Sequence, residues 1–332
     1  MRSKINHRAL RILYEIVVLA AAVCLLWNGL FLLGCSLMPE RTTFGAVWSS
    51  YLQEERESVD VLFLGSSRAY CNVIPARIFR NTGVTSYVMA GPSQTTSMSY
   101  YYLRECLKTQ KPKCVFMECS GAFYGLYEEY SKVNVCYMPG GINRILAARQ
   151  CEDGILDLAL YPLQEFHFRI YAEDRDLPPE EDGVMLCGYT PLSEAAEQTE
   201  RTVRKHGVKG GDERYAHNLS YLKKIAELCR DEGVICIFYY APAMGTYEES
   251  SLERLMADLS QTPCAAVENW GNLIEEIGID SALDWFDSIH FNQSGATKFS
   301  DYLSAYIKDL GIPETQGANA DLWAKRYAYL YG

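Results

Sequence analysis

Two short stretches that lie far apart in the sequence supply the residue types of a nucleophilic serine site. In the first, an apolar run from Val59 to Leu64 ends abruptly in Gly65-Ser66-Ser67, which presents a hydroxyl group at the carboxyl end of a strand. The second, Asp287-Ser288-Ile289-His290, places a carboxylate and an imidazole three positions apart. A serine is a weak nucleophile by itself, and a histidine held by a carboxylate can accept its proton.

These residues predict a triad in which Ser67 is the nucleophile, His290 is the general base and Asp287 orients and stabilises the imidazole. Ser66 is the alternative nucleophile, and a pair of serines can also simply form a turn or cap a helix. The backbone N–H groups of Ser67 and Gly91 are the candidate donors to the oxyanion that develops when the hydroxyl attacks a carbonyl.

The segments that must position these residues alternate between strand-like and helix-like patterns. Strands are predicted at 59–65, 84–90, 113–119 and 233–240, with a further one near Ala265. Helices are predicted at 75–80, 95–109, 213–232, 250–259 and 294–310. This alternation predicts an α/β fold, a three-layer α/β/α arrangement around a central parallel sheet. Because functional residues collect at the carboxyl ends of parallel strands, Ser67, Gly91 and Ser120 are expected to converge on one crevice.

The alternation is interrupted between residues 121 and 211. Turn signals such as Pro139-Gly140-Gly141 and Lys209-Gly210-Gly211 separate short amphipathic pieces there. We interpret 121–211 as an insertion over the site rather than a separate domain. The domain then covers 59–312, and residues 313–332 form an aromatic C-terminal tail.

The N-terminal region has the pattern of a membrane anchor. Residues 1–11 are basic, and the apolar run at 12–38 exceeds the ~20 residues that cross a bilayer. The basic residues before this run and the acidic juxtamembrane segment 39–58 after it place the N-terminus in the cytoplasm and the domain outside. A competing interpretation is a cleaved lipoprotein signal, since Leu32-Leu33-Gly34-Cys35 is similar to a lipobox. The length of the run favours an uncleaved signal-anchor.

Composition excludes some classes of partner and cofactor. The net charge of -11 and the lack of a basic stripe outside the N-terminus argue against nucleic-acid binding. Twelve cysteines are present, but no Cys-x-x-Cys motif and no histidine pair at ligand spacing, so neither a metal site nor a cofactor is predicted. Disulfides and free thiols are both compatible with this cysteine pattern.

At Gly65-Ser66-Ser67 and Asp287-x-x-His290 the chain resembles the SGNH/GDSL hydrolase superfamily, whose first block is Gly-Asp-Ser and whose last is Asp-x-x-His. The resemblance covers roughly residues 59–120 and 213–310. The Gly-Ser-Ser variant, the N-terminal membrane segment and the stretch from Glu165 to Arg169 are similar to the membrane-anchored cell-envelope branch, as is Asp287 to Asn292. That branch includes alginate O-acetylation proteins and the DltD protein of teichoic-acid D-alanylation. The resemblance implies acyl transfer or ester hydrolysis on a surface glycopolymer.

One block of that superfamily is missing from the chain. In the wider family a Gly-x-Asn-Asp block donates an Asn side chain to the oxyanion hole, and Met117 to Gly121 occupy its expected place here. Gln94 and Ser120 are the candidate replacements for this donor. The other candidate substrate-binding residues are Arg68, His167 and Arg169. The alternative for Arg68 is an exposed loop charge, and for His167 and Arg169 a structural role.

The expected function is therefore extracytoplasmic acyl transfer, with acetyl as the favoured group, to a hydroxyl of a cell-envelope polysaccharide or teichoic-acid-like polymer. The resemblance and the anchor suggest a membrane-bound O-acyltransferase as partner. A carbohydrate esterase or deacetylase would use the same triad, with water in place of the sugar hydroxyl. The alternative outside enzymes is a non-catalytic envelope-polymer assembly protein that keeps the fold.

Overall fold

The computed structural model describes residues 7–36, 47–126, 128–151, 180–193, 202–204 and 211–332. The chain divides into two units, and the helix α1 (His7–Ser36) belongs to the first. This helix is long and apolar enough to cross a membrane, and its side chains from residue 7 to residue 26 are exposed. A helix of this length and composition fits the predicted anchor at 12–38.

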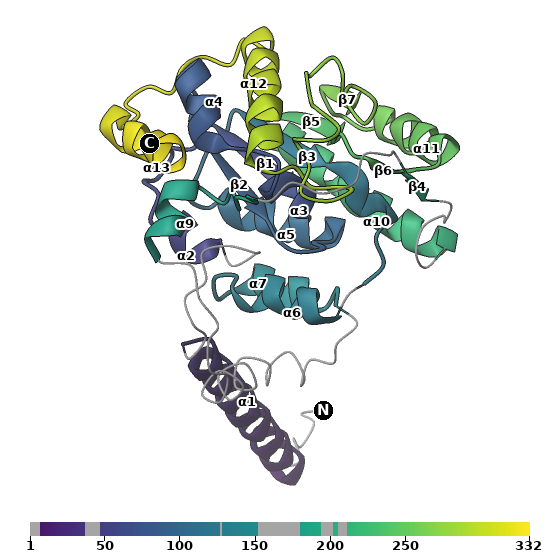
Figure 1. Cartoon of the computed structure of the whole chain (residues 1–332). Coiled ribbons are helices and arrows are strands. Elements are labelled where there is room, and N and C mark those ends of the chain that lie inside the picture. The colour runs from purple at the N-terminus through teal and green to yellow at the C-terminus, as the bar shows by residue number, and fades with distance from the viewer. Residues whose placement is uncertain (1–6, 37–46, 127, 152–179, 194–201, 205–210) are drawn as a thin grey trace, which may run out of the picture. The chain divides into compact units, whose positions relative to one another are not determined.

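The second unit is built around a parallel sheet of five strands (Figure 1). The strands are β1 (Val61–Gly65), β2 (Ser86–Ala90), β3 (Cys114–Glu118), β5 (Ile235–Tyr240) and β7 (Ala266–Asn269). Their order is β2-β1-β3-β5-β7, and every neighbouring pair is parallel. The order reverses beside β1, because β2 is added on one side of it and β3 on the other. In such sheets a crevice forms at the carboxyl ends of the strands at this point.

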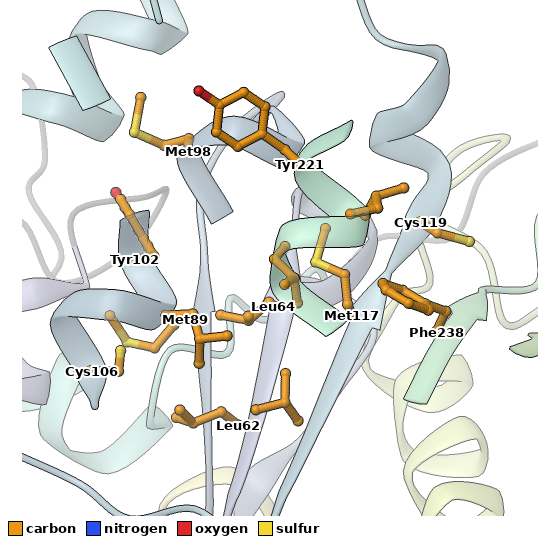
Figure 2. Close-up of a cluster of buried hydrophobic side chains, with 14 of the residues drawn as sticks. Leu62, Leu64, Met89, Met98, Tyr102, Cys106, Met117, Cys119, Tyr221 and Phe238 are labelled. Atoms are coloured by element: carbon orange, nitrogen blue, oxygen red, sulfur yellow. The ribbon is translucent and has the colours of Figure 1, made fainter. Parts of the chain in front are cut away.

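Helices flank both faces of this sheet, and the strand side chains alternate between them (Figure 1). Leu62 and Leu64 join a buried cluster with α5 (Thr96–Cys106) and α10 (Gly211–Asp231), part of which Figure 2 shows. Val61 and Phe63 join a second buried cluster with α4 (Pro75–Thr82) and α12 (Gln293–Asp309). Strands that are apolar on both faces are the pattern of a parallel sheet buried on both sides.

Shorter elements complete the second unit. They are α2 (Trp48–Tyr51), α3 (Ser67–Tyr70), the 3-10 helix η1 (Cys119–Phe123), α6 (Glu128–Cys136), α7 (Ile142–Ala148), α9 (Glu180–Leu186), α11 (Glu249–Ser260) and α13 (Ala320–Tyr331). Two short strands, β4 (Thr202–Arg204) and β6 (Gly245–Tyr247), pair in parallel as a separate small sheet. The described parts of the predicted insertion 121–211 lie in the same unit as the central sheet.

The predicted parallel α/β sheet is confirmed, with shifts at the ends of the elements. The first strand begins at Val61 rather than residue 59. The backbone N–H of Asp60 donates to the Thr85 side chain at 3.1 Å and not to the backbone of a neighbouring strand. The predicted helix 95–109 begins after Thr95, whose side chain caps it by accepting from Met98 N–H at 3.3 Å. The tail 313–332 contains helix α13, whose Trp323 stacks on Phe79 with ring centroids 4.7 Å apart.

Candidate active site

The turn after β1 depends on a glycine. Gly65 has a φ of +149°, a conformation that residues with a side chain rarely adopt, and an added Cβ would lie 2.8 Å from Cβ of Glu118. The chain then reverses through Ser66, which is extended, and enters the short helix α3 at Ser67. The Gly-Ser-Ser stretch therefore places Ser67 at the carboxyl end of β1, as the sequence predicts.

The structure brings Ser67, His290 and Asp287 together. His290 Nε2 lies 2.7 Å from Ser67 Oγ, and His290 Nδ1 lies 2.7 Å from Asp287 Oδ2. A carboxylate can only accept, so Nδ1 donates its proton to Asp287 and Nε2 is left to accept the Ser67 hydroxyl proton. This is the arrangement in which an imidazole can act as a general base on a serine.

A tight loop before α12 fixes the carboxylate and the imidazole. Asp287 Oδ1 accepts from the N–H groups of Ile289 at 2.8 Å and His290 at 2.9 Å, while Phe286 N–H donates to His290 O at 2.9 Å. The three-residue spacing works because one carboxylate oxygen closes the backbone turn and the other orients the ring. Burial raises the pKa of Asp287, but its hydrogen bond to His290, the His290 charge and these N–H groups outweigh burial and lower it overall.

Asn72 joins the two halves of the site. Its Oδ1 accepts from Phe291 N–H at 3.0 Å, and it is fully buried. Since Asn72 follows helix α3 and Phe291 follows His290, this bond ties the segment that carries Ser67 to the segment that carries His290. Sequence reasoning missed this residue, and the only local signal is that Asn72 is a polar residue beside the serine motif.

Asp284 also stabilises this loop through hydrogen bonds. Its buried carboxylate accepts from Lys298 Nζ, Ser294 Oγ and Asp280 N–H, each at 2.6 Å. Burial raises its pKa, but these hydrogen bonds outweigh burial and lower it overall. Asn292 caps α12, its side chain accepting from Gly295 N–H at 3.2 Å, so the helix begins directly after the loop that carries Asp287 and His290.

Ser66 faces away from the imidazole, into a polar chain of side chains. Its Oγ lies 2.9 Å from the Tyr124 hydroxyl, which lies 3.0 Å from Ser120 Oγ, and Ser120 Oγ donates to Glu118 at 2.5 Å. Ser120 is fully buried, and its hydroxyl proton is directed to Glu118. The hydroxyl groups of Ser66 and Ser120 therefore both make their contacts inside the protein.

Arg68 differs from the expected exposed loop charge, because its side chain is buried. Only 2% of the residue is exposed; Nη1 lies 3.6 Å from Glu118 Oε1, and Nη2 donates to Ala241 O. Its guanidinium also lies over the Tyr240 ring, 4.2 Å from the centroid. Burial lowers the pKa of Arg68, but its interactions with Tyr240 and Glu118 outweigh burial and raise the pKa overall, so the guanidinium stays charged. The charge of Arg68 is therefore directed into the protein and paired there.

Gly91 follows β2 and lies against two side-chain amides. A Cβ added at Gly91 would overlap Asn134 Oδ1 and would lie 3.1 Å from Gln94 Oε1. Gln94 is buried and donates to Ser99 Oγ at 3.0 Å, and Asn134 of α6 donates to Pro92 O at 3.1 Å. Sequence reasoning missed Asn134, because it lies in the insertion and belongs to no recognisable block.

The remaining predicted residues, His167 and Arg169, lie outside the described residues. Within the described ranges, no three His, Cys, Asp or Glu side chains form a group that could hold a metal ion. No protein-family model matches this sequence, and a search of curated proteins finds no match either.

Proposed function

We propose that this chain is a serine acyltransferase that acts on esters through Ser67, His290 and Asp287. The observation that carries the proposal is the pair of 2.7 Å contacts that joins Ser67 Oγ to His290 Nε2 and His290 Nδ1 to Asp287. His290 takes the Ser67 proton as Oγ attacks the donor carbonyl, and the new imidazolium is stabilised by Asp287. It then protonates the leaving oxygen, which breaks the old ester bond and leaves the acyl group on Ser67.

In the second half of the reaction an acceptor hydroxyl replaces the leaving group. His290 removes the proton of that hydroxyl, the hydroxyl oxygen attacks the acyl carbonyl, and Ser67 Oγ leaves with the proton. The acceptor is a hydroxyl of a cell-envelope polysaccharide or teichoic-acid-like polymer in a transferase, and water in an esterase. Both activities use the same residues and differ only in which acceptor reaches the acyl group.

The oxyanion that forms on the carbonyl needs hydrogen-bond donors. The N–H of Ser67 is the natural donor, because it opens helix α3, where no intrahelical carbonyl is available to it. We assign the second donor to Gly91 N–H. We infer that the Asn134 side chain supplies the third donor from Nδ2, which donates one of its two N–H bonds to Pro92 O, whereas its Oδ1 is the atom that lies against Gly91.

The resemblance to the SGNH/GDSL superfamily supports this proposal at the level of both site and architecture. A three-layer α/β/α fold of flavodoxin-like strand order places the nucleophile after the first strand, at the reversal of strand order, which is where β1 and Ser67 lie here. The chain lacks the Gly-x-Asn-Asp block, and Asn134 offers its amide from α6 instead. The membrane-anchored envelope branch supplies the functional analogy, with an acetyl group as the favoured acyl group and a membrane-bound O-acyltransferase as its supplier.

The proposed location is the outer face of the membrane. Arg2, Lys4, Arg8 and Arg11 precede α1, so the positive-inside tendency holds the N-terminus in the cytoplasm and exposes the sheet unit outside. A reporter enzyme fused after Gly332 tests this directly. Activity of a periplasm- or exterior-dependent reporter supports the proposal, and activity of a cytoplasm-dependent reporter rejects an envelope polymer as substrate.

An active-site label tests the chemistry. The full chain in detergent micelles is treated with an alkyl fluorophosphonate, and the modified residue is located by mass spectrometry. We expect labelling of Ser67 in the wild type and in the matched control Ser66→Ala, and none in Ser67→Ala. Labelling that survives Ser67→Ala but disappears in Ser66→Ala moves the nucleophile to Ser66. Absence of label in all three proteins supports the non-catalytic assembly role.

A second measurement separates transfer from hydrolysis. The acetyl-enzyme is formed with 4-nitrophenyl acetate, and its decay is followed in buffer and with added oligosaccharide. Acetylated sugar and faster decay support a transferase, whereas release of acetate at an unchanged rate supports an esterase.

A further inference from the structure

The chain from the end of β5 to the start of β6 is irregular but buried along its whole length. It comprises residues 241–245, and Ala241 and Met244 pack in the second buried cluster, the one that contains α4 and α12. Pro242 limits the flexibility of this segment, because the proline ring fixes φ. Buried backbone groups outside helices and strands need hydrogen-bond partners, so the two ends of the segment require them.

The first end of this segment is bound to the residue that follows Ser67. Ala241 O accepts from Nη2 of Arg68, and Arg68 lies directly after Ser67 in α3. The guanidinium has little freedom, since Nη1 lies 3.6 Å from Glu118 Oε1 at the end of β3 and its carbon lies 4.2 Å from the centroid of the Tyr240 ring. This end of the segment is therefore fixed to the part of the chain that carries Ser67.

The other end of the segment is bound to the loop that carries Asp287 and His290. Gly245 N–H donates to the carbonyl oxygen of Ser288 at 2.5 Å, and Ser288 lies between Asp287 and His290 in the sequence. The approach leaves little room for a side chain, because a Cβ added at Gly245 would lie 3.2 Å from Ser288 Oγ and 3.3 Å from Ser288 Cβ. The φ of Gly245 lies outside the left-handed region, so close approach rather than backbone conformation favours glycine here.

We propose that segment 241–245 is a positioning element that sets the distance between Ser67 and His290, an inference that rests on the proposed function. These two residues are 223 positions apart in the sequence, yet Ser67 Oγ lies 2.7 Å from His290 Nε2. The segment reaches both sides of this contact, through Arg68 on one side and Ser288 on the other. A short buried segment transmits a displacement rather than absorbing it, because close-packed interiors are stiff.

The position of the loop and its internal order are separate properties. Asp287 Oδ1 accepts from His290 N–H at 2.9 Å and Oδ2 lies 2.7 Å from His290 Nδ1, so this pair is held within the loop itself. A side chain at Gly245 pushes Ser288 by a few tenths of an ångström. The loop then keeps its pair of Asp287 and His290 but loses the alignment of His290 with Ser67. This lowers the rate at which Ser67 reacts and leaves the pH dependence of that rate unchanged.

The rate at which an alkyl fluorophosphonate modifies Ser67 tests the inference. The full chain in detergent micelles is treated with an excess of the reagent over a range of pH, and modified Ser67 is quantified by mass spectrometry. We expect Gly245→Ala to lower the rate about tenfold, since a misplacement of ~1 Å can cost about a hundredfold. The midpoint of its pH–rate profile should stay as in the wild type.

A second substitution provides the matched control. Ser288→Gly removes the two atoms that a Cβ at residue 245 would meet first and keeps the carbonyl oxygen that accepts from Gly245. In the Ser288→Gly background, Gly245→Ala should therefore lower the rate less than about twofold. Ile225→Val controls for a general loss of stability, because it removes a buried methyl group from α10 in the first cluster. It should leave the rate and the midpoint as in the wild type.

Arg68→Lys loosens the other end of the segment. Lysine keeps a charge beside Glu118 but lacks the planar fork with which the guanidinium also reaches Ala241 O. This variant should lower the rate about tenfold with an unchanged midpoint. It decides between the same outcomes if Gly245→Ala does not keep the near-ultraviolet circular dichroism spectrum of the wild type.

Four results overturn the inference. They are a wild-type rate in the folded Gly245→Ala protein, an equally large loss from Gly245→Ala in the Ser288→Gly background, an equally large loss in Ile225→Val, and a shifted midpoint, which would show that the loop itself is disordered. Each of them, with Ser67 modified in the wild type, rejects the positioning role alone. Absence of label on Ser67 in the wild type rejects the proposed function and this inference with it.

Discussion

The buried pair of Arg68 and Glu118 gives the sharpest quantitative prediction. The side chains of both residues are at most 3% exposed, and their charges are 3.6 Å apart. At an effective dielectric constant of about 20 this attraction is about 4–5 kcal/mol before desolvation is subtracted. Removal of one partner leaves the other charge buried, so Glu118→Leu and Arg68→Met should each cost about 3–5 kcal/mol of unfolding free energy.

The double variant Arg68→Met/Glu118→Leu should be more stable than either single variant. Two apolar side chains of similar size need no ionic partner, and such replacements are often neutral or stabilising. Ser120 loses its acceptor in this variant, which costs about 1–3 kcal/mol. The interaction energy from the double-mutant cycle should therefore exceed ~2 kcal/mol.

Urea unfolding of the full chain in micelles, followed by tryptophan fluorescence, measures these free energies. The matched control is the exposed pair of Lys111 and Glu57, whose nitrogen and oxygen atoms are 2.8 Å apart, and Lys111→Gln should cost less than about 1 kcal/mol. Additive costs in the Arg68 and Glu118 cycle, or single costs as small as that of Lys111→Gln, refute the reasoning.

Three further predictions concern the site itself. His290→Ala should lower the acylation rate by about 10⁴- to 10⁶-fold and should cost almost nothing more in a Ser67→Ala background, and independent losses would show that the two residues do not act as a unit. Gly91→Ala should destabilise the protein by about 1–3 kcal/mol, because its Cβ overlaps Asn134, and an unchanged urea midpoint argues against this contact. Asp284→Asn should destabilise the protein at pH 7 by about 1.5–3 kcal/mol, since it weakens bonds to a charged carboxylate. The pKa of Asp284 is lower in the folded than in the unfolded protein, so the stabilisation by its carboxylate is complete above the unfolded pKa of about 3.9. This stabilisation is lost as the pH falls through the folded pKa. A destabilisation by Asp284→Asn that stays constant below pH ~4 contradicts the assignment.

The triad positions could be predicted because each depends on a local pattern. An apolar run that ends in Gly65-Ser66-Ser67 identifies a strand end, and the turn in Asp287-x-x-His290 is closed by its own backbone. The parallel sheet then supplies the long-range step, because it gathers strand carboxyl ends at one edge. The meeting of Ser67 and His290 could therefore be predicted from these two local patterns and the sheet, without any other residue that is distant in sequence.

The support of the triad could not be predicted, because it depends on partners that are distant in sequence. Arg68 was expected on the surface, as arginine usually is, yet its donors reach Glu118 and Ala241. Asn72 and Asn134 belong to no sequence motif. Their roles become visible only when the fold places Phe291 beside Asn72 and Gly91 beside Asn134. One signal was present: Glu118 ends an apolar strand, and a carboxylate there needs a partner when it is buried.

The buried Glu118 carboxylate also fixes the direction of hydrogen-bond donation along the row of side chains from Ser66 through Tyr124 and Ser120 to Glu118. Glu118 can only accept, so Ser120 must donate its hydroxyl proton to it, and the 3.0 Å contact is then made by Tyr124 donating to Ser120. Tyr124 has one hydroxyl proton, so Ser66 must donate in the 2.9 Å contact that remains. Burial raises the pKa of Tyr124, so it keeps that proton. The proton of Ser66 thus points away from His290, and of the two neighbouring serines only Ser67 has its proton directed to a base.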